Sequence, residues 1–141
     1  MTRTLILFGA GPGIGNVTST PFPPSSPLTQ PQHVAAKFAS TGIQHIILLA
    51  RNTQRLQNSD APFVSQASPN VKVDTLRLDL ADLPSIPSVL QQLDDLTKDE
   101  DVEVVFFNAA RIKPSEVLNV SVGEIDEDFR VCTYSAMSHS W

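Results

Sequence analysis

The residues that could do chemistry begin with a glycine-rich stretch, Gly-Ala-Gly-Pro-Gly-Ile-Gly, at positions 9–15. Glycines permit a tight turn, and they let backbone N–H groups approach a phosphate without a Cβ in the way. The stretch directly follows an apolar segment at residues 5–8, which favours phosphate binding over a plain strand-to-helix turn. A P-loop ATPase is excluded, because no Gly-Lys-Ser/Thr ends the stretch.

A second candidate position, Ala50-Arg51, follows the next apolar segment. Folds that bind dinucleotides usually carry a carboxylate there, which contacts the 2′-hydroxyl of the ribose. Ala50 lacks that carboxylate, and Arg51 supplies a guanidinium that can pair with a 2′-phosphate. A solvated surface arginine is the alternative interpretation of Arg51.

Two more polar positions follow later apolar segments. Asp79 could contact the edge of an adenine, or it could only cap the next turn. Asn108, Ala109 and Ala110 form a small, amide-bearing segment that could line a ribose. All of these positions would have to lie side by side to hold one ligand.

A parallel sheet would bring these positions together. Continuously apolar or mixed segments predict four strands, at residues 5–8, 45–50, 71–80 and 102–107. They alternate with helical segments, which implies right-handed crossovers and helices on both faces of the sheet. We therefore expect an α/β, three-layer Rossmann-like fold with strand order 3-2-1-4, whose ligands bind beyond the carboxyl ends of the strands.

The helical segments are predicted from apolar residues at helical spacing. Three such segments occur, at residues 34–39, 86–96 and 125–136. Ser121 and Glu124, just before the last one, match a capping box. A shorter helix is expected at residues 51–57, and Asp60-Ala61-Pro62 is expected to end it.

These motifs, taken in order, resemble those of the short-chain dehydrogenase/reductase family. The family's Thr-Gly-x-x-x-Gly-x-Gly loop appears as Phe8 followed by residues 9–15, its Asp-Leu pair as Asp79-Leu80, and its Asn-Asn-Ala-Gly segment as residues 107–110. Phe8 replaces the Thr, and one Asn and the last Gly are lost. The resemblance implies an N-terminal cofactor-binding half, with NADP(H) favoured over NAD(H) through Ala50-Arg51. It assigns cofactor binding to Gly9, Gly11, Gly13, Ile14, Gly15, Arg51, Asn52, Asp79, Leu80, Asn108, Ala109 and Ala110.

The catalytic residues of that family have no counterpart in this chain. The family's Ser lies on the following strand and its Tyr-x-x-x-Lys pair on the helix after it, whereas Tyr134 is followed four residues on by Ser138. The mechanism needs a tyrosine made acidic by a nearby cation to protonate the substrate oxygen. We therefore expect the NADP(H)-binding part of an oxidoreductase, with no catalytic residue of its own. The alternative is a non-catalytic nucleotide-binding or interaction module.

Residues 17–32 interrupt the expected strand-helix-strand unit. This run contains Pro21, Pro23, Pro24, Pro27 and Pro31. Arg51 lies 36 positions after Gly15, whereas such a unit places the corresponding residue about 20 positions on. We interpret the run as an irregular insertion, since its prolines oppose helix formation. It is either a translated intron or a docking loop, because it also matches the P-x-x-P pattern that SH3-type modules bind.

Composition bounds the remaining possibilities. The 141 residues fit one domain, and the net charge of −5 without a basic cluster excludes nucleic-acid and anionic-membrane binding. The single cysteine, Cys132, fits a reducing compartment, so we expect a cytoplasmic protein. The three histidines are too far apart in sequence to suggest a metal site. The apolar strand at residues 102–107 would form a sheet edge, which favours self-association.

Overall fold

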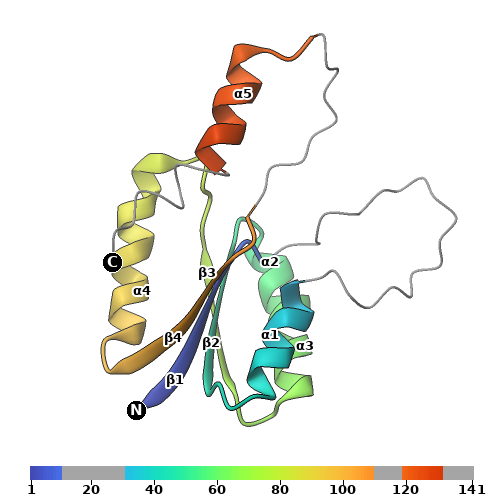
Figure 1. Ribbon diagram of the computed structural model, residues 1–141, viewed down its shortest axis with the longest axis vertical. Helices are drawn as coiled ribbons and strands as arrows, with labels where there is room; N and C mark the ends of the chain where they lie inside the picture. The colour runs from blue at the N-terminus through green and yellow to red at the C-terminus, as the bar shows by residue number, and fades with distance from the viewer. Residues whose placement is uncertain (11–30, 110–118, 132–141) are drawn as a thin grey trace, which may run out of the picture.

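The computed structural model describes residues 1–10, 31–109 and 119–131. It contains one sheet of parallel strands in the order β3-β2-β1-β4, which confirms the predicted strand order (Figure 1). The strands are β1 (Thr2–Phe8), β2 (His45–Ala50), β3 (Lys72–Arg77) and β4 (Glu100–Phe107). The bounds of β2 are those predicted, and the other strands differ from prediction only at their ends.

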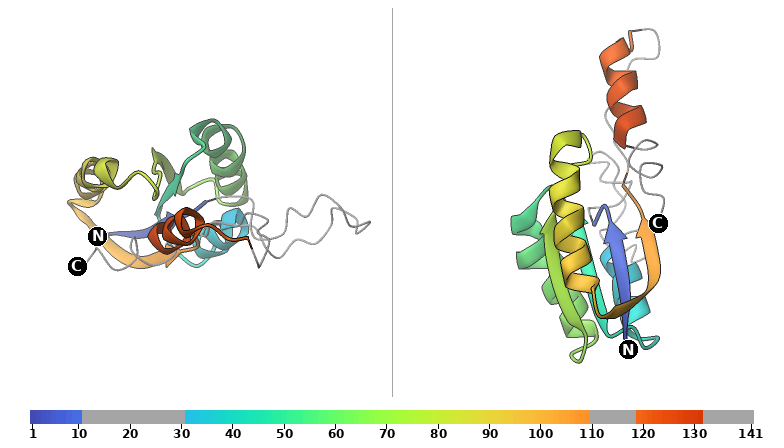
Figure 2. Two further views of the ribbon diagram at one scale, coloured as in Figure 1. Left: turned by 90° about the horizontal axis from the view of Figure 1, so that it is seen from above. Right: turned by 90° about the vertical axis from the view of Figure 1, so that its left-hand side faces the viewer.

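Helices cover both faces of the sheet, as the three-layer prediction requires (Figures 1 and 2). The first face is covered by α1 (Pro31–Ala39), α2 (Thr53–Arg55), a π-helical segment (Leu56–Asp60) and α3 (Ala61–Ala67). A 3-10 turn (Leu83–Ser85) and α4 (Ile86–Thr97) lie on the opposite face. Within the described ranges no helix is both long and apolar enough to cross a membrane.

The two central strands are apolar throughout because both of their faces are covered. Leu5 and Leu7 of β1 pack with α1 and α3, whereas Ile6 and Phe8 pack with α4. The side chains of β2 alternate in the same way between the two cores. The sheet therefore has a separate apolar core on each side, and its central strands belong to both.

Helix α1 begins inside the expected insertion. Its first residue is Pro31, so the last two residues of the run at 17–32 are helical rather than irregular. Proline suits the first position of a helix, because the N–H that it lacks would have no partner there. The rest of the insertion lies outside the described residues.

The helical region after β2 is longer than predicted, and Pro62 does not end it. Helix α2, the π-helical segment and α3 follow one another without a break as far as Ala67. The N–H of Ala61 donates to the carbonyl of Leu56, five residues earlier. A proline ring clashes with the carbonyl four residues before it in a regular α-helix, and the wider π-helical turn relieves this clash.

Helix α5 (Val122–Phe129) has the predicted capping box. The Ser121 hydroxyl accepts from the Glu124 N–H at 3.2 Å, and the Ser121 N–H donates to the Glu124 carboxylate at 3.0 Å. Its apolar face is not buried as expected, since Ile125 is 45% exposed and Phe129 58%. The reason is its position, because α5 stands away from the sheet, beyond the carboxyl end of β4 (Figures 1 and 2). The continuation of this face beyond residue 131 lies outside the described residues.

Gly9 ends β1 in a conformation that other residues rarely adopt. Its φ is +80°, in the left-handed region. A Cβ on Gly9 would lie 2.6 Å from both the N and the Cα of Ala109, which follows β4. The turn after β1 and its close approach to the end of β4 therefore both require glycine.

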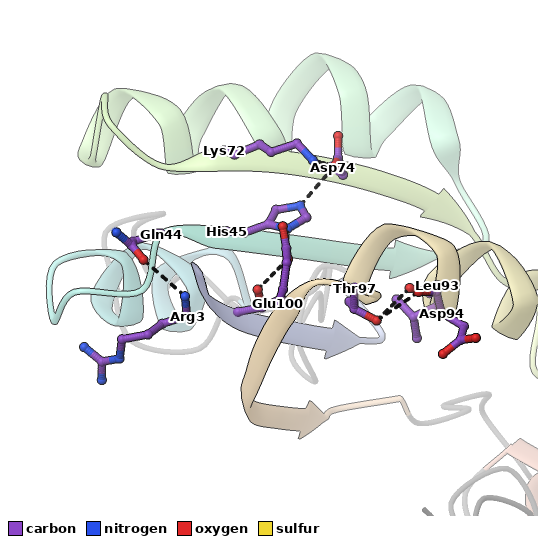
Figure 3. A network of polar contacts seen from close by, with 10 residues as sticks. Arg3, Gln44, His45, Lys72, Asp74, Leu93, Asp94, Thr97 and Glu100 are labelled. Carbon is purple, nitrogen blue, oxygen red and sulfur yellow. Dashed lines mark hydrogen bonds and ion pairs between the residues drawn. The ribbon is translucent and has the colours of Figure 1, made fainter. Parts of the chain in front are cut away.

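A polar network ties the strands together near their amino-terminal ends (Figure 3). The buried ring of His45, on β2, contacts the Glu100 carboxylate through Nδ1 at 2.5 Å and the Asp74 carboxylate through Nε2 at 3.0 Å. The Thr4 hydroxyl donates to the same Glu100 oxygen at 2.6 Å, and Lys72 Nζ lies 2.8 Å from Asp74. One residue or more from each of the four strands takes part.

Both carboxylates of this network are stronger acids than usual. Burial alone would raise the pKa of Asp74, but the hydrogen bonds and positive charges of Lys72 and His45 hold that pKa below its usual value. Burial would likewise raise the pKa of Glu100, but hydrogen bonds from Thr4 and His45 and the charges of His45 and Lys72 lower it. The folded protein therefore favours the ionised form of both side chains.

We expect the protein to lose stability in acid partly through Asp74 and Glu100. Their folded-state pKa values lie below the unfolded values. Their contribution is thus present above about pH 4.5 and is lost as the pH falls through the lowered folded-state values. Urea unfolding between about pH 5 and pH 3 should show a smaller loss for the Asp74→Asn, Glu100→Gln double variant than for the native chain. An equal loss would contradict this role.

Substitution of Gly9 by alanine should destabilise the fold. The strained φ and the contact with the Ala109 backbone predict a loss of about 2 kcal/mol or more in the free energy of unfolding. Gly123→Ala is the matched control, because only Ser121 Oγ, at 3.9 Å, lies near the added Cβ. That change in α5 should stabilise by about 0.5 kcal/mol. Similar urea midpoints for the two variants would count against the steric account of Gly9.

Candidate functional site

The predicted site residues that the structure describes lie at the carboxyl edge of the sheet. Gly9 directly follows β1, Arg51 follows β2, Asp79 lies two residues beyond β3, and Asn108 directly follows β4. The chain beyond β3 stays beside β2, because the Leu78 N–H donates to the Ala50 carbonyl at 3.0 Å. The strand order thus places Asp79, Arg51, Gly9 and Asn108 in sequence along this edge.

In the glycine-rich turn after β1, the first two backbone N–H groups are hydrogen-bonded to the neighbouring strand β2. The N–H groups of Gly9 and Ala10 both donate to the Leu49 carbonyl, at 2.9 and 3.1 Å. These amides anchor the turn to β2 and are not available to a phosphate. Any phosphate contact from this loop must come from later residues, and Gly11, Gly13, Ile14 and Gly15 lie outside the described residues.

The end of β2 carries an arginine, Arg51, where dinucleotide-binding folds usually carry a carboxylate. Ala50 is half-buried and Arg51 is exposed. Within the described ranges, the Arg51 side chain forms no hydrogen bond or ion pair, so its guanidinium is free to meet a ligand. The Asn52 side chain caps α2, because its Oδ1 accepts from the Arg55 N–H at 3.0 Å.

A buried ion pair lies behind this end of β2, and sequence reasoning did not find it. Asp60 is 1% exposed, and its Oδ1 lies 3.1 Å from an Arg55 guanidinium nitrogen. Burial raises the pKa of Asp60, and the charge and hydrogen bond of Arg55 partly offset this effect. Arg55 is thereby held in the helical layer, which leaves Arg51 as the arginine exposed directly after the strand.

Arg77 is a second exposed cation that the sequence analysis did not assign. It is the last residue of β3 and lies opposite Ala50 in the pairing register of β2 and β3. In the sequence Arg77 lies two positions before Asp79, so a strand that ends near Asp79 and lies next to β2 would also have placed Arg77 at the carboxyl edge. A guanidinium at this place adds positive charge near the end of β2.

The segment after β3 is mainly structural in its described contacts. Asp79 Oδ1 accepts from the Ala81 N–H at 3.1 Å, which is the turn-capping alternative considered for this residue. Leu80 is buried in the core beneath α4. Its side chain therefore packs inside the protein, and only its backbone could contact a ligand.

The segment after β4 continues the sheet before it leaves. The Asn108 N–H donates to the Phe8 carbonyl at 2.8 Å, and the Asn108 side chain is exposed. Ala109 packs against the core on the α4 side, while Ala110 lies outside the described residues. Phe8 and Phe107 pack ring to ring with centroids 5.8 Å apart. Phe8, which replaces the family's Thr, thus joins the ends of β1 and β4.

Comparisons by sequence find no relative: no family model matches the chain, and no curated protein matches it either. Solved structures do match it. YwfH, an NADPH-dependent reductase involved in bacilysin biosynthesis, aligns with a TM-score of 0.72 and 18% identity over 98% of this chain. A mutant of a Serratia marcescens short-chain dehydrogenase/reductase aligns at 0.65 and 17% over 95%. The NADH-dependent reductase A1-R′, complexed with NAD, aligns at 0.66 and 15% over 96%.

The alignments cover almost all of this chain but less than half of each neighbour. The covered share is 46% of YwfH, 46% of the Serratia protein and 47% of the A1-R′ reductase. At these identities the comparison establishes the fold. The chain has the Rossmann-like fold of the short-chain dehydrogenases/reductases and spans about half their length.

Proposed function

We propose that this chain binds NADP(H) at the carboxyl edge of its sheet, as the cofactor-binding part of a short-chain-type oxidoreductase. The observation that carries the proposal is the end of β2, where an exposed arginine follows an alanine in place of the carboxylate that is usual there. The four strand ends supply the edge itself. The single cysteine of the sequence supports a cytoplasmic setting for this function.

The charge at this position decides between the two dinucleotides. A carboxylate there would accept a hydrogen bond from a ribose 2′-hydroxyl and would repel a 2′-phosphate. The Arg51 guanidinium does the opposite, since it can donate two hydrogen bonds to a phosphate and compensate its charge. Asn108, with an exposed carboxamide beside small Ala109, would face the ribose nearer the nicotinamide.

The structural neighbours support a nicotinamide dinucleotide but leave the preference to this chain's own residues. YwfH is described as NADPH-dependent and A1-R′ as NADH-dependent, so both forms occur with this fold. When bound, the nicotinamide supplies a hydride donor or acceptor. The described residues of this chain bind and orient the cofactor, and none is proposed to transfer a proton to a substrate.

We further propose that binding by this chain alone is not accompanied by carbonyl reduction. Its sequence has no tyrosine followed four positions later by lysine, because Ser138 follows Tyr134. Such a pair is what supplies the proton to the substrate oxygen in the resembled family. Enhanced fluorescence of NADPH without turnover of ketones supports the proposal, whereas turnover of a ketone would refute this part of it.

The Arg51→Asp variant tests the cofactor preference. Loss of a charge-assisted contact and gain of a carboxylate should weaken NADPH binding by about 10- to 100-fold. NADH binding should be unchanged or stronger, because Asp can contact the 2′-hydroxyl. Titration calorimetry with both dinucleotides measures the two affinities.

Lys37→Asp is the matched control for this experiment. Lys37 is also exposed, and it lies in the last turn of α1, away from the carboxyl ends of the strands. The same change in net charge there should leave the ratio of the two affinities as it is in the native chain. Native protein that binds NADPH and NADH equally, or an Arg51→Asp variant with an unaltered ratio, would overturn the proposal.

We also propose self-association through strand β4, which forms one edge of the sheet. Val102 and Val105 of this strand are 37% and 47% exposed. An apolar edge strand offers both backbone hydrogen-bonding groups and side chains to another strand. A second copy of the chain would bring an identical edge, and two such edges can pair about a two-fold axis.

Val105→Lys should weaken this self-association. A charged side chain on an edge strand opposes strand pairing, because its charge would be buried between the two copies. Sedimentation equilibrium should show a dimer of the native chain that dissociates at least about tenfold more readily in the variant. Thr75→Lys, on the opposite edge strand β3, should leave the dimer intact. A native chain that stays monomeric at high concentration, or a dimer weakened only by Thr75→Lys, would contradict the role of β4.

A further inference from the structure

The ring of His45 lies at the amino-terminal edge of the sheet, opposite the proposed cofactor site. It is 0% exposed and alternates with Ile46, so it lies on the side that α4 covers. Both ring nitrogens lie within hydrogen-bonding distance of a carboxylate oxygen. Nδ1 of the ring contacts Glu100, and Nε2 of the ring contacts Asp74. Sequence reasoning gave His45 no role beyond that of starting a strand.

These two contacts constrain where the protons are. A neutral imidazole carries one N–H and one lone pair, and ionised carboxylates only accept hydrogen bonds. With a neutral ring, one of the two contacts would therefore bring a nitrogen lone pair against a carboxylate oxygen. A second proton must lie either on the ring or on one of the carboxylates.

The surroundings of the carboxylates favour their ionised forms. Glu100 Oε2 already accepts a hydrogen bond from the Thr4 hydroxyl, and Asp74 is paired with the Lys72 ammonium. Although burial opposes it, the hydrogen bond and charge of Lys72 lower the pKa of Asp74, and the hydrogen bond from Thr4 and the charge of Lys72 lower the pKa of Glu100. The second proton therefore belongs on the ring, which makes both nitrogens donors.

The charges around the ring balance only when it is protonated. From β3 it faces Lys72 and Asp74, from β4 Glu100, and from β1 the uncharged Thr4. The charged residues in the last turns of α4 and directly after it are exposed to water; they are Asp94, Asp95, Lys98 and Asp99. An imidazolium gives this cluster two positive and two negative groups, whereas a neutral ring leaves one negative charge uncompensated beside the buried ring.

We propose that His45 is held as an imidazolium and acts as a proton-dependent latch that ties β2 to both edge strands, β3 through Asp74 and β4 through Glu100. Loss of the second proton removes one of the two donors. One edge strand is then released at its amino-terminal end, while the central pair of strands stays in place. The latch is independent of the proposed dinucleotide site, which lies at the other end of the strands.

The protonation state can be read directly by nitrogen NMR on chain labelled with ¹⁵N-histidine. At about pH 6, the His45 ring should show two N–H groups and two nitrogens with imidazolium shifts. His45→Gln identifies the signal, because only that resonance disappears. A ring with one protonated and one bare nitrogen in the folded chain at that pH would overturn the proposal.

Substitution of the acceptors separates the latch from general packing. Glu100→Gln and Asp74→Asn keep an oxygen that can accept a hydrogen bond, but each removes a negative charge. Each should lower the fraction of doubly protonated rings at about pH 6 by several-fold. Glu103→Gln, also on β4 but paired with Arg3 outside the cluster, should leave that fraction unchanged. Equal effects of all three variants would overturn the proposal.

Hydrogen exchange tests the conformational consequence. Protection factors, corrected for the intrinsic dependence of exchange on pH, should fall at the amino-terminal ends of β3 or β4 as the His45 ring loses its second proton. The amides of β1 and β2 should keep their protection. In His45→Gln the edge amides should already exchange faster, with no further change over that range of pH. Protection in the native chain that does not change when the NMR signal reports deprotonation would overturn the latch.

Discussion

The fold depends on burying β1 and β2 from both sides. A strand with two covered faces is apolar along its whole length, and the chain between successive strands here forms the helices that cover them. Such crossover connections make the strands parallel. Parallel strands bring all of their carboxyl ends to one edge, so residues as far apart in sequence as Gly9 and Asn108 become neighbours. The candidate site is a consequence of how the core is buried.

The sequence was sufficient to predict the features that follow from this burial. The apolar runs of β1 and β2, the helical stripe of α4 and the capping box at Ser121 all appear where the pattern places them. Features set by particular contacts, with no repeating pattern in the sequence, could not be predicted in the same way. Pro62 was expected to end a helix, but a π-helical segment before it removes the clash. The pairing of buried Asp60 with Arg55 has no periodic signal at all.

Polar groups have opposite surroundings at the amino-terminal and the carboxyl ends of the strands. Near the amino-terminal ends, His45, Glu100 and Asp74 compensate one another inside the protein, where an unpaired charge would be costly. At the carboxyl edge, Arg51 and Asn108 extend into water with no compensating side chain among the described residues. Polar groups that pair with one another stabilise a fold, whereas exposed polar groups without such a pair are available to bind a ligand. This contrast is why the carboxyl edge is the place to look for a ligand.

The glycine-rich turn shows that one residue can satisfy a motif for a reason other than the expected one. Gly9 matches the first position of a phosphate-binding loop, yet its N–H is bonded to Leu49 and its missing Cβ makes room for Ala109. Its conformation therefore serves the join between β1, β2 and β4. If the proposed dinucleotide binds, other groups along the carboxyl ends of the strands must supply the affinity and the preference. Under the proposed function, the guanidinium of Arg51 is the group expected to distinguish a phosphorylated ribose from a free one.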